Sequence, residues 1–334
     1  MARNSRMLLS RFSNLSHTFG SKFRALSPPN IFMEKTQENS YNETWFKNRA
    51  FNSIRPIDTT HWDYSDSLLL YIPGSEGDYQ AIQTIENPYY EAVTKPEREY
   101  LQSIASKVVG QLPRQFDYVD LGPGTEHKEQ FIFDAAKEQN KKFTYIPVDI
   151  NNKFLELAEN YAGAQGIPTQ SIHTSFEELV HKLPSNNIPR LVSLGLTYTN
   201  YAPQEILRLL KDIAGKKGYI FIDTQIRDRV DMGNLVKIYS QDGYFISAKK
   251  LQLIDLGRED VETHVDDGIR VWATLKNSTP QLIQKGIKAG ATLLLFQSRR
   301  NTVDTFEEEI KKSSKTYTLF DTGATFVGAL IRTE

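Results

Sequence analysis

Apolar and polar positions follow a regular rhythm from about residue 96 to residue 225. Short apolar runs predict strands over residues 116–122, 143–150, 190–196 and 218–225. Before and between them, apolar residues recur every three or four positions, which predicts amphipathic helices over residues 96–112, 126–139, 152–163 and 203–214. Strands that alternate with helices at this spacing form mostly parallel sheets with helices on both faces. We therefore predict an α/β fold with a doubly wound sheet.

Two segments depart from this rhythm. Residues 35–95 are rich in Tyr, Trp, Asn and Asp and predict short helices and loops without a sheet. Residues 226–290 are polar and mixed, and they predict a strand, a turn and a strand over residues 261–276. The α/β pattern then returns with an apolar run at 291–298, a helix at 304–314 and a last strand at 325–332. We expect a core of residues 96–226 plus 298–334 and a substrate-binding domain of residues 35–95 plus 227–297.

The first 34 residues form a basic extension. Residues 1–33 contain five Lys or Arg residues, many serines and no acid. This composition is typical of an organelle-targeting segment, but it equally fits an extension without a targeting role. We expect a cytoplasmic protein, with organelle targeting as the alternative.

Composition excludes several classes of protein. No apolar run approaches the roughly 20 residues of a membrane span, and a net charge of −1 gives no basic surface for nucleic acid. The chain has no cysteine, which excludes disulfides, thiolate nucleophiles and cysteine metal sites. The six histidines fall in no metal-ligand spacing, so we expect no metal centre. The oligomeric state stays open.

The candidate chemistry begins at a glycine turn. Asp120-Leu-Gly122-Pro-Gly124 follows a predicted strand and precedes a predicted helix, where glycine lets the backbone approach a cofactor. The turn lacks the third glycine of a dinucleotide fingerprint and the Gly-Lys-Ser/Thr end of a phosphate loop. Asp149 ends the next strand, where an acid can accept hydrogen bonds from ribose hydroxyls, and Phe176 offers a flat ring to an adenine. The pair of turn and acid is closer to S-adenosylmethionine (SAM) methyltransferases than to dinucleotide enzymes.

Several segments together resemble the SAM-dependent L-histidine Nα-methyltransferase family of ergothioneine biosynthesis, over about residues 65–333. They are residues 71–97, 120–128, 145–150, 194–203 and 239–243. The resemblance implies a Rossmann-like class I methyltransferase core with an added substrate-binding domain. It also implies SAM as the cofactor, held by the following residues: Gly122, Gly124, Thr125, Lys128, Asp149 and Phe176.

The resemblance also implies a substrate pocket. Asn200 and Tyr239 match the residues that hold the substrate's carboxylate and amine in that family, and Tyr71 and Tyr89 match tyrosines of the same pocket. An amide and phenols suit this task because they orient a zwitterion without adding charge. We take Tyr71, Asn200 and Tyr239 as the candidate catalytic residues.

The chain departs from the family where the family recognises imidazole. A Glu and a Ser two residues apart perform that task, and residues 295–302 place Gln297 and Arg299 there, although a shift of one residue would bring Ser298 to the serine position. Val271 replaces a pocket methionine. Arg299 either points into the pocket or lies at the surface with its neighbour. Such a pocket is less suited to an imidazole N–H, so we expect a substrate other than histidine.

We therefore predict an N-methyltransferase of secondary metabolism that uses SAM and acts on an amino acid or a related small amine. In-line transfer from a sulfonium needs an aligned neutral amine and no nucleophilic side chain; Tyr71 or a nearby acid could take the amine proton. An alternative is a SAM- or ligand-binding protein without turnover that serves as a regulator or partner subunit. A nicotinamide-dependent oxidoreductase is disfavoured by the missing third glycine.

Overall fold

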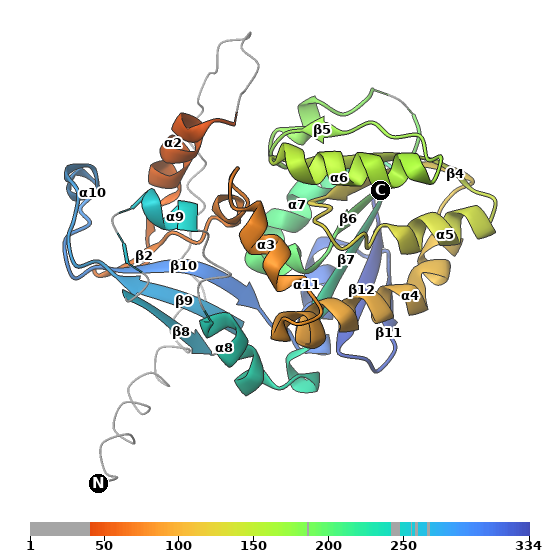
Figure 1. The fold of residues 1–334 in the computed structure, drawn as a ribbon. Helices are drawn as coiled ribbons and strands as arrows, with labels where there is room; N and C mark the ends of the chain where they lie inside the picture. The colour runs from red at the N-terminus through yellow and green to blue at the C-terminus, as the bar shows by residue number, and fades with distance from the viewer. Residues whose placement is uncertain (1–40, 186, 242–247, 255, 258–259, 266–267) are drawn as a thin grey trace. The chain divides into compact units, whose positions relative to one another are not determined.

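The computed structural model describes residues 41–334 apart from 186, 242–247, 255, 258–259 and 266–267. The basic extension, residues 1–34, lies outside the described residues. Two sheets organise the described part of the chain (Figure 1).

The larger sheet has seven strands in the order β11-β12-β7-β6-β3-β4-β5. Its strands are β3 (Gln115–Leu121), β4 (Lys142–Asp149), β5 (Ile172–His173), β6 (Arg190–Leu194), β7 (Tyr219–Gln225), β11 (Tyr317–Asp321) and β12 (Phe326–Arg332). The pairings among β3, β4, β5, β6 and β7 are parallel, as predicted, whereas β12 runs antiparallel to both β7 and β11. The prediction omitted β11 and the two-residue β5.

Helices cover both faces of this sheet, which confirms the doubly wound α/β fold. They are α4 (Lys95–Gly110), α5 (Gln130–Glu138), α6 (Asn152–Ala164), α7 (Pro203–Ala214) and α11 (Val303–Ser313). Apolar residues of α7 and α11 pack in one core, and those of α4 and α5 in another. Proline near the first turn starts α4 and α7, and the side chain of Asn151 caps α6. α5 begins four residues later than predicted, after a turn in which His127 has a φ of 50°.

The smaller sheet has five strands in the order β1-β2-β10-β9-β8. Its strands are β1 (Arg55–Pro56), β2 (His61–Asp63), β8 (Val261–Val265), β9 (Gly268–Thr274) and β10 (Thr292–Arg299). The prediction that residues 35–95 contribute no sheet is wrong, because β2 pairs in parallel with β10. The sequence does not reveal β2 because three residues are too few to show an alternation of apolar and polar positions. Its partner strand also lies more than 200 residues away in the sequence. The assignment of this sheet to substrate binding stays a prediction.

Short elements connect and flank the sheets. They are α2 (Glu43–Ser53), η1 (Ser67–Leu70), α3 (Glu76–Ile82), η2 (Tyr90–Thr94), η3 (Leu179–His181), η4 (Leu196–Asn200), η5 (Arg227–Arg229), α8 (Met232–Ser240), α9 (Ala248–Gln252) and α10 (Pro280–Gln284).

The carboxyl end of β10 reaches the larger sheet. Just after β10, Asn301 bridges to Ile226, which directly follows β7. Ser298 Oγ lies 2.9 Å from Thr199 Oγ1 in η4, the turn after β6. The chain also reverses its direction of progress across the sheet at β3, since β4 and β6 lie on opposite sides of it. Ligands of open α/β sheets bind at such a switch point, outside the carboxyl ends of the strands. β10 therefore ends beside the expected ligand crevice.

The close packing around Gly328 in β12 leads to a testable prediction. A Cβ at this position would lie 2.8 Å from Tyr100 Oη and 3.1 Å from the ring of Phe221. Gly328→Ala should therefore lower the free energy of unfolding by about 1–3 kcal/mol, measured by urea denaturation. Gly163→Ala, in α6 with open space around it, should raise it by about 0.5–1 kcal/mol. Equal effects of the two substitutions would contradict the predicted close contact.

Candidate active site

The glycine turn after β3 has a backbone that other residues rarely adopt. Gly122 and Gly124 have φ values of 69° and 66°, in the left-handed region that favours glycine. The Gly122 amide donates to Val148 O at 2.9 Å, which ties the turn to the end of β4. A Cβ at Gly122 would lie 3.7 Å from Phe176 Cζ. The two glycines thus open a cradle between the turn and an aromatic ring.

This cradle forms one wall of a first cavity of about 530 Å³, its solvent-open part included. The cavity brings together four of the six predicted cofactor residues, namely Gly122, Gly124, Asp149 and Phe176. Asp149 Oδ1 accepts from the Asn151 amide at 2.8 Å. Burial raises the pKa of Asp149 to about 7, against the backbone hydrogen bonds that lower it. A buried carboxylate of this kind is suited to receive hydroxyl donors.

The other two predicted cofactor residues lie differently. Lys128 lines a second cavity, and its Nζ donates to Glu97 Oε1 at 3.0 Å. Burial opposes the charge of Lys128, but Glu97, Glu126 and Asp223 together raise its pKa above the usual range. Thr125 is half-buried, and the described lining of neither cavity includes it. Its place in cofactor binding stays a prediction.

The second cavity, of about 870 Å³ with its solvent-open part, contains the candidate catalytic residues. Tyr71, Tyr89, Asn200 and Tyr239 all line it, although they come from segments far apart in the sequence. The two cavities meet at shared walls. The residues that line both are Tyr71, Tyr79, Gly122 and Thr197.

Tyr71 is a neutral phenol at this junction. Burial raises the pKa of Tyr71 to about 12, and its hydrogen bond with Thr197 offsets only part of that effect. A group with this pKa does not act as a proton acceptor near neutral pH. This raised pKa disfavours Tyr71 as the acceptor of the amine proton, whereas its neutral phenol can orient a ligand by hydrogen bonding.

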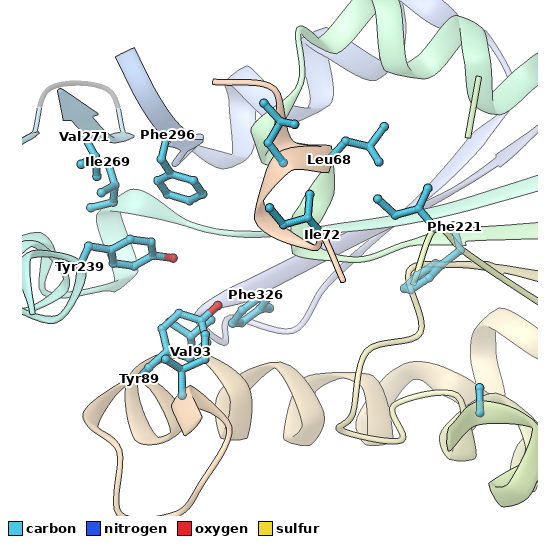
Figure 2. Packing of buried hydrophobic residues seen from close by; sticks show 14 of the residues in the cluster. Leu68, Ile72, Tyr89, Val93, Phe221, Tyr239, Ile269, Val271, Phe296 and Phe326 are labelled. Atoms are coloured by element: carbon cyan, nitrogen blue, oxygen red, sulfur yellow. The ribbon is translucent and has the colours of Figure 1, made fainter. Parts of the chain in front are cut away.

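Aromatic rings form part of the wall of the second cavity. The ring centroids of Tyr89 and Tyr239 are 5.9 Å apart, and those of Tyr239 and Phe296 are 5.8 Å apart. Figure 2 shows Phe296 and Tyr239 near each other, with Val271 beside Phe296. Val271 pairs with Phe296 across β9 and β10 and is buried. The described cavity lining includes Phe296 and leaves out Val271, which lies beside Phe296 on the same face of the sheet.

The alternation of β10 corrects the predicted imidazole-recognition positions. The register of β10 shifts between Leu294 and Phe296 and is regular from there to the end of the strand. Phe296 and Ser298 line the cavity. Side chains of successive strand residues point to opposite faces, so Gln297 and Arg299 face away from it.

Arg299 is held on that opposite face. Its Nη1 forms an ion pair of 2.6 Å with Glu309 Oε1, and its guanidinium lies 5.3 Å from the ring centre of Tyr198. Neither predicted position, Gln297 or Arg299, is among the described residues that line the second cavity. The alternative alignment, with Ser298 at the serine position, agrees with the structure.

Arg300 is a buried residue of the site that the sequence did not reveal. The interpretation of the tandem arginines as a surface pair is wrong, because Arg300 is only 1% exposed. Its guanidinium donates to uncharged oxygens, which are Gln225 Oε1 at 3.0 Å, Ser298 Oγ at 2.6 Å, Tyr239 Oη at 2.9 Å and the Arg299 carbonyl at 2.9 Å. Arg300 therefore positions two side chains of the cavity wall. No local signal in the sequence distinguishes a buried arginine from one at the surface.

A second unpredicted group lies at the junction. Tyr79 Oη donates to Glu126 Oε1 at 2.6 Å, and Glu126 lines the second cavity beside the glycine turn. Glu126 belongs to the turn segment of residues 120–128, but only the fold brings it to α3.

Two negative findings apply to the described residues alone. They contain no group of three or more His, Asp or Glu side chains placed to hold a metal ion. None of their helices combines the length and the apolar character needed to cross a membrane.

The fold and the first cavity define a class of protein. A glycine turn after the first parallel strand, an acid at the end of the second and a crevice at the switch point form a nucleotide-binding α/β core of the Rossmann-like class I type. Residues 70–230 match the model of a family described as histidine-specific methyltransferase, SAM-dependent. This match covers 161 of the 334 residues, just under half of the chain, and confirms the resemblance to SAM-dependent methyltransferases over the strands β3 to β7.

Individual relatives agree with this class. Histidine N-alpha-methyltransferase of Mycolicibacterium smegmatis is 27% identical over 201 residues, which are 59% of this chain and 62% of that protein. The 4-dimethylallyltryptophan N-methyltransferase of Aspergillus fumigatus is 28% identical over 127 residues, 34% of this chain and 36% of that protein. The chain thus spans about three fifths or less of the length of these two relatives.

Two solved structures align with this chain at low TM-scores. Human N-acetylserotonin methyltransferase in complex with SAM aligns with a TM-score of 0.43 and 15% identity over 80% of this chain and 59% of that one. A SAM-dependent methyltransferase from Clostridium acetobutylicum aligns with a TM-score of 0.42 and 13% identity over 76% of this chain and 96% of that one.

The first cavity fits this cofactor. The open space at Gly122 would admit a nucleoside beside Phe176, and the buried carboxylate of Asp149 would accept hydrogen bonds from ribose hydroxyls.

The raised pKa of Asp149 predicts that the affinity for the cofactor depends on pH. Its unliganded pKa is about 7, and ribose hydroxyls would donate to the charged form. Below pH 7 the carboxyl group must lose a proton on binding, so the affinity for S-adenosylhomocysteine should fall by up to about tenfold per pH unit. Above pH 8 the affinity should be constant. Calorimetric titration between pH 5.5 and pH 8.5 measures this dependence.

Asp149→Asn is the control for this prediction. The variant should bind S-adenosylhomocysteine more weakly at pH 8 and should lose the pH dependence. It thereby separates Asp149 from Asp120, whose pKa burial and nearby Glu129 raise to about 6. A wild-type affinity that rises toward low pH would contradict the assigned role of Asp149.

Proposed function

We propose that the protein transfers a methyl group from SAM to the nitrogen of an amino acid or a related small amine other than histidine. One observation carries this proposal: the cofactor cavity and the second cavity share the walls formed by Tyr71, Tyr79, Gly122 and Thr197. A ligand in the second cavity would therefore lie next to the reactive end of a cofactor in the first. We further propose that residues 35–95 and 227–297 act as the substrate-binding domain.

The chain's own residues would perform the positioning on which methyl transfer depends. SAM supplies a methyl group on a sulfonium that is already a good leaving group. The protein mainly has to align a neutral amine, exclude water and accept a proton. Tyr71, Asn200 and Tyr239 offer uncharged hydrogen-bonding groups around the second cavity. These groups can orient a small polar ligand without holding its amine in the protonated form.

Phe296 supports a substrate other than histidine. The family uses a Glu and a Ser two residues apart to recognise imidazole, and the two residues of β10 at that spacing that line the cavity are Phe296 and Ser298. An aromatic ring thus stands where the carboxylate would be. It cannot accept a hydrogen bond from an imidazole N–H in the ring plane, so a buried imidazole would leave its donor unpaired.

The test is methyl transfer from labelled SAM to a panel of the twenty amino acids and their decarboxylated amines. At least one member with an apolar or aromatic side chain should be methylated on nitrogen, with a kcat/KM at least about 100-fold above that of histidine. Transfer to no member, or histidine as the best substrate, would refute the proposal.

Phe296→Glu tests the specificity argument directly. The new carboxylate should raise kcat/KM for histidine by about tenfold or more and lower it for apolar members of the panel. Gln297→Glu is the matched control, because the same charge one residue further along β10 faces away from the cavity. If both variants change substrate preference alike, the assigned alternation of β10 is wrong.

A further inference from the structure

Glu126 carries a buried carboxylate oxygen without a partner at the wall of the second cavity. Its Oε1 accepts from Tyr79 Oη at 2.6 Å, whereas its Oε2 is buried and has no hydrogen-bond partner among the described residues. The position of a Cβ at Gly124 would be 2.7 Å from this same Oε2. The carboxylate therefore lies against the glycine turn, where the two cavities meet.

Neighbouring groups hold Glu126 in place through its Oε1 and its backbone carbonyl, and not through Oε2. Tyr79, which donates to Oε1, comes from α3 and lines both cavities. Arg98 of α4 donates to the backbone carbonyl of Glu126. The ammonium of Lys128 lies close enough to interact electrostatically with Glu126, but its hydrogen bond goes to Glu97.

An unpartnered buried carboxylate oxygen indicates a ligand that donates to it. Leaving such an acceptor unpaired is unfavourable, and a charged donor provides the strongest compensation. Glu126 lines the second cavity, whereas the described lining of the first does not include it. The donor would thus come from the ligand of the second cavity, next to the shared walls.

Other groups at this wall are less suited to accept a proton. Asp78 and Glu97 are the other acids among the described lining residues, and neither has an unpartnered buried oxygen. Burial raises the pKa of Tyr71 to about 12 and the pKa values of Tyr79 and Tyr89 well above the usual range, so all three stay neutral. Glu97 is ion-paired with Lys128 at 3.0 Å.

We propose that Glu126 binds the ammonium group of the substrate through Oε2 and accepts its proton before methyl transfer. This inference rests on the proposed function. One N–H bond breaks and one O–H bond forms on Glu126, which leaves a neutral amine. The amine lone pair then forms the N–C bond while the C–S bond breaks with its electrons remaining on sulfur. The methylated ammonium departs, and Glu126 returns its proton to solvent.

The experiment compares Glu126→Gln with Glu129→Gln. Glu129 is a matched control from the same turn: it is buried and also has an unpartnered Oε2, but it does not line the second cavity among the described residues. For both variants and the wild type, kcat/KM is measured from pH 6 to pH 10. The substrate is the panel amine that the wild type methylates fastest. Calorimetry measures the affinity for S-adenosylhomocysteine as a test of intact cofactor binding.

Glu126→Gln should lower kcat/KM by about 100-fold at pH 7. The difference should shrink to within about fivefold at pH 10, because a free amine no longer needs a proton acceptor. Its affinity for S-adenosylhomocysteine should stay within about twofold of the wild type. Glu129→Gln should show a pH profile parallel to that of the wild type.

Three results would overturn the inference. Glu126→Gln could keep wild-type rates at pH 7, it could be slowed equally at every pH as a purely structural change would be, or it could lose affinity for S-adenosylhomocysteine by tenfold or more. In each of these cases the wild type is active, so the proposed function survives. A wild type that methylates no panel amine refutes the proposed function and this inference with it.

Discussion

The site depends on one topological constraint, the reversal of strand order at β3. Because β4 and β6 flank β3 on opposite sides, the chain leaves a crevice beyond its carboxyl end. Gly122 and Gly124 take up positive φ angles at that point, so the turn passes close to Phe176 without a side chain between them. η4 after β6 and the end of β10 converge on the same place. Both cavities are consequences of this convergence.

The parts of the fold that the sequence predicts are those whose signal is local. The helices α4, α6 and α7 carry their own apolar stripes, and the parallel strands are apolar runs with turns at their ends, so their bounds differ from prediction by only a few residues. β1 and β2 have no such signal. They are strands only because β10 offers β2 an edge, and a pairing between residues 61–63 and 292–294 depends on the whole intervening chain.

The candidate site divides in the same way. The glycine turn and Asp149 are predictable because they sit at the ends of recognisable strands, and Asn200 and Tyr239 follow from a resemblance of short segments. The residues of β10 are not predictable at that level. A register shift between Leu294 and Phe296 decides which residues face the cavity, and a displacement of one residue exchanges the two faces of a strand. An alignment by sequence alone therefore named Gln297 and Arg299 in place of Phe296 and Ser298.

Buried charged groups of opposite sign lie at the two ends of the second cavity and make it electrostatically asymmetric. At the β10 end, the positive charge of Arg300 lies within 2.6 Å of Ser298 Oγ and 2.9 Å of Tyr239 Oη, so this end favours an electron-rich group. At the glycine turn, Glu126 presents an oxygen that can only accept while it is charged. A small ligand with an electron-rich end and an amine end would satisfy both ends in one orientation. That orientation would place its nitrogen beside the cofactor cavity, where the proposed transfer requires it, and its remaining side chain against the rings of Tyr89 and Phe296.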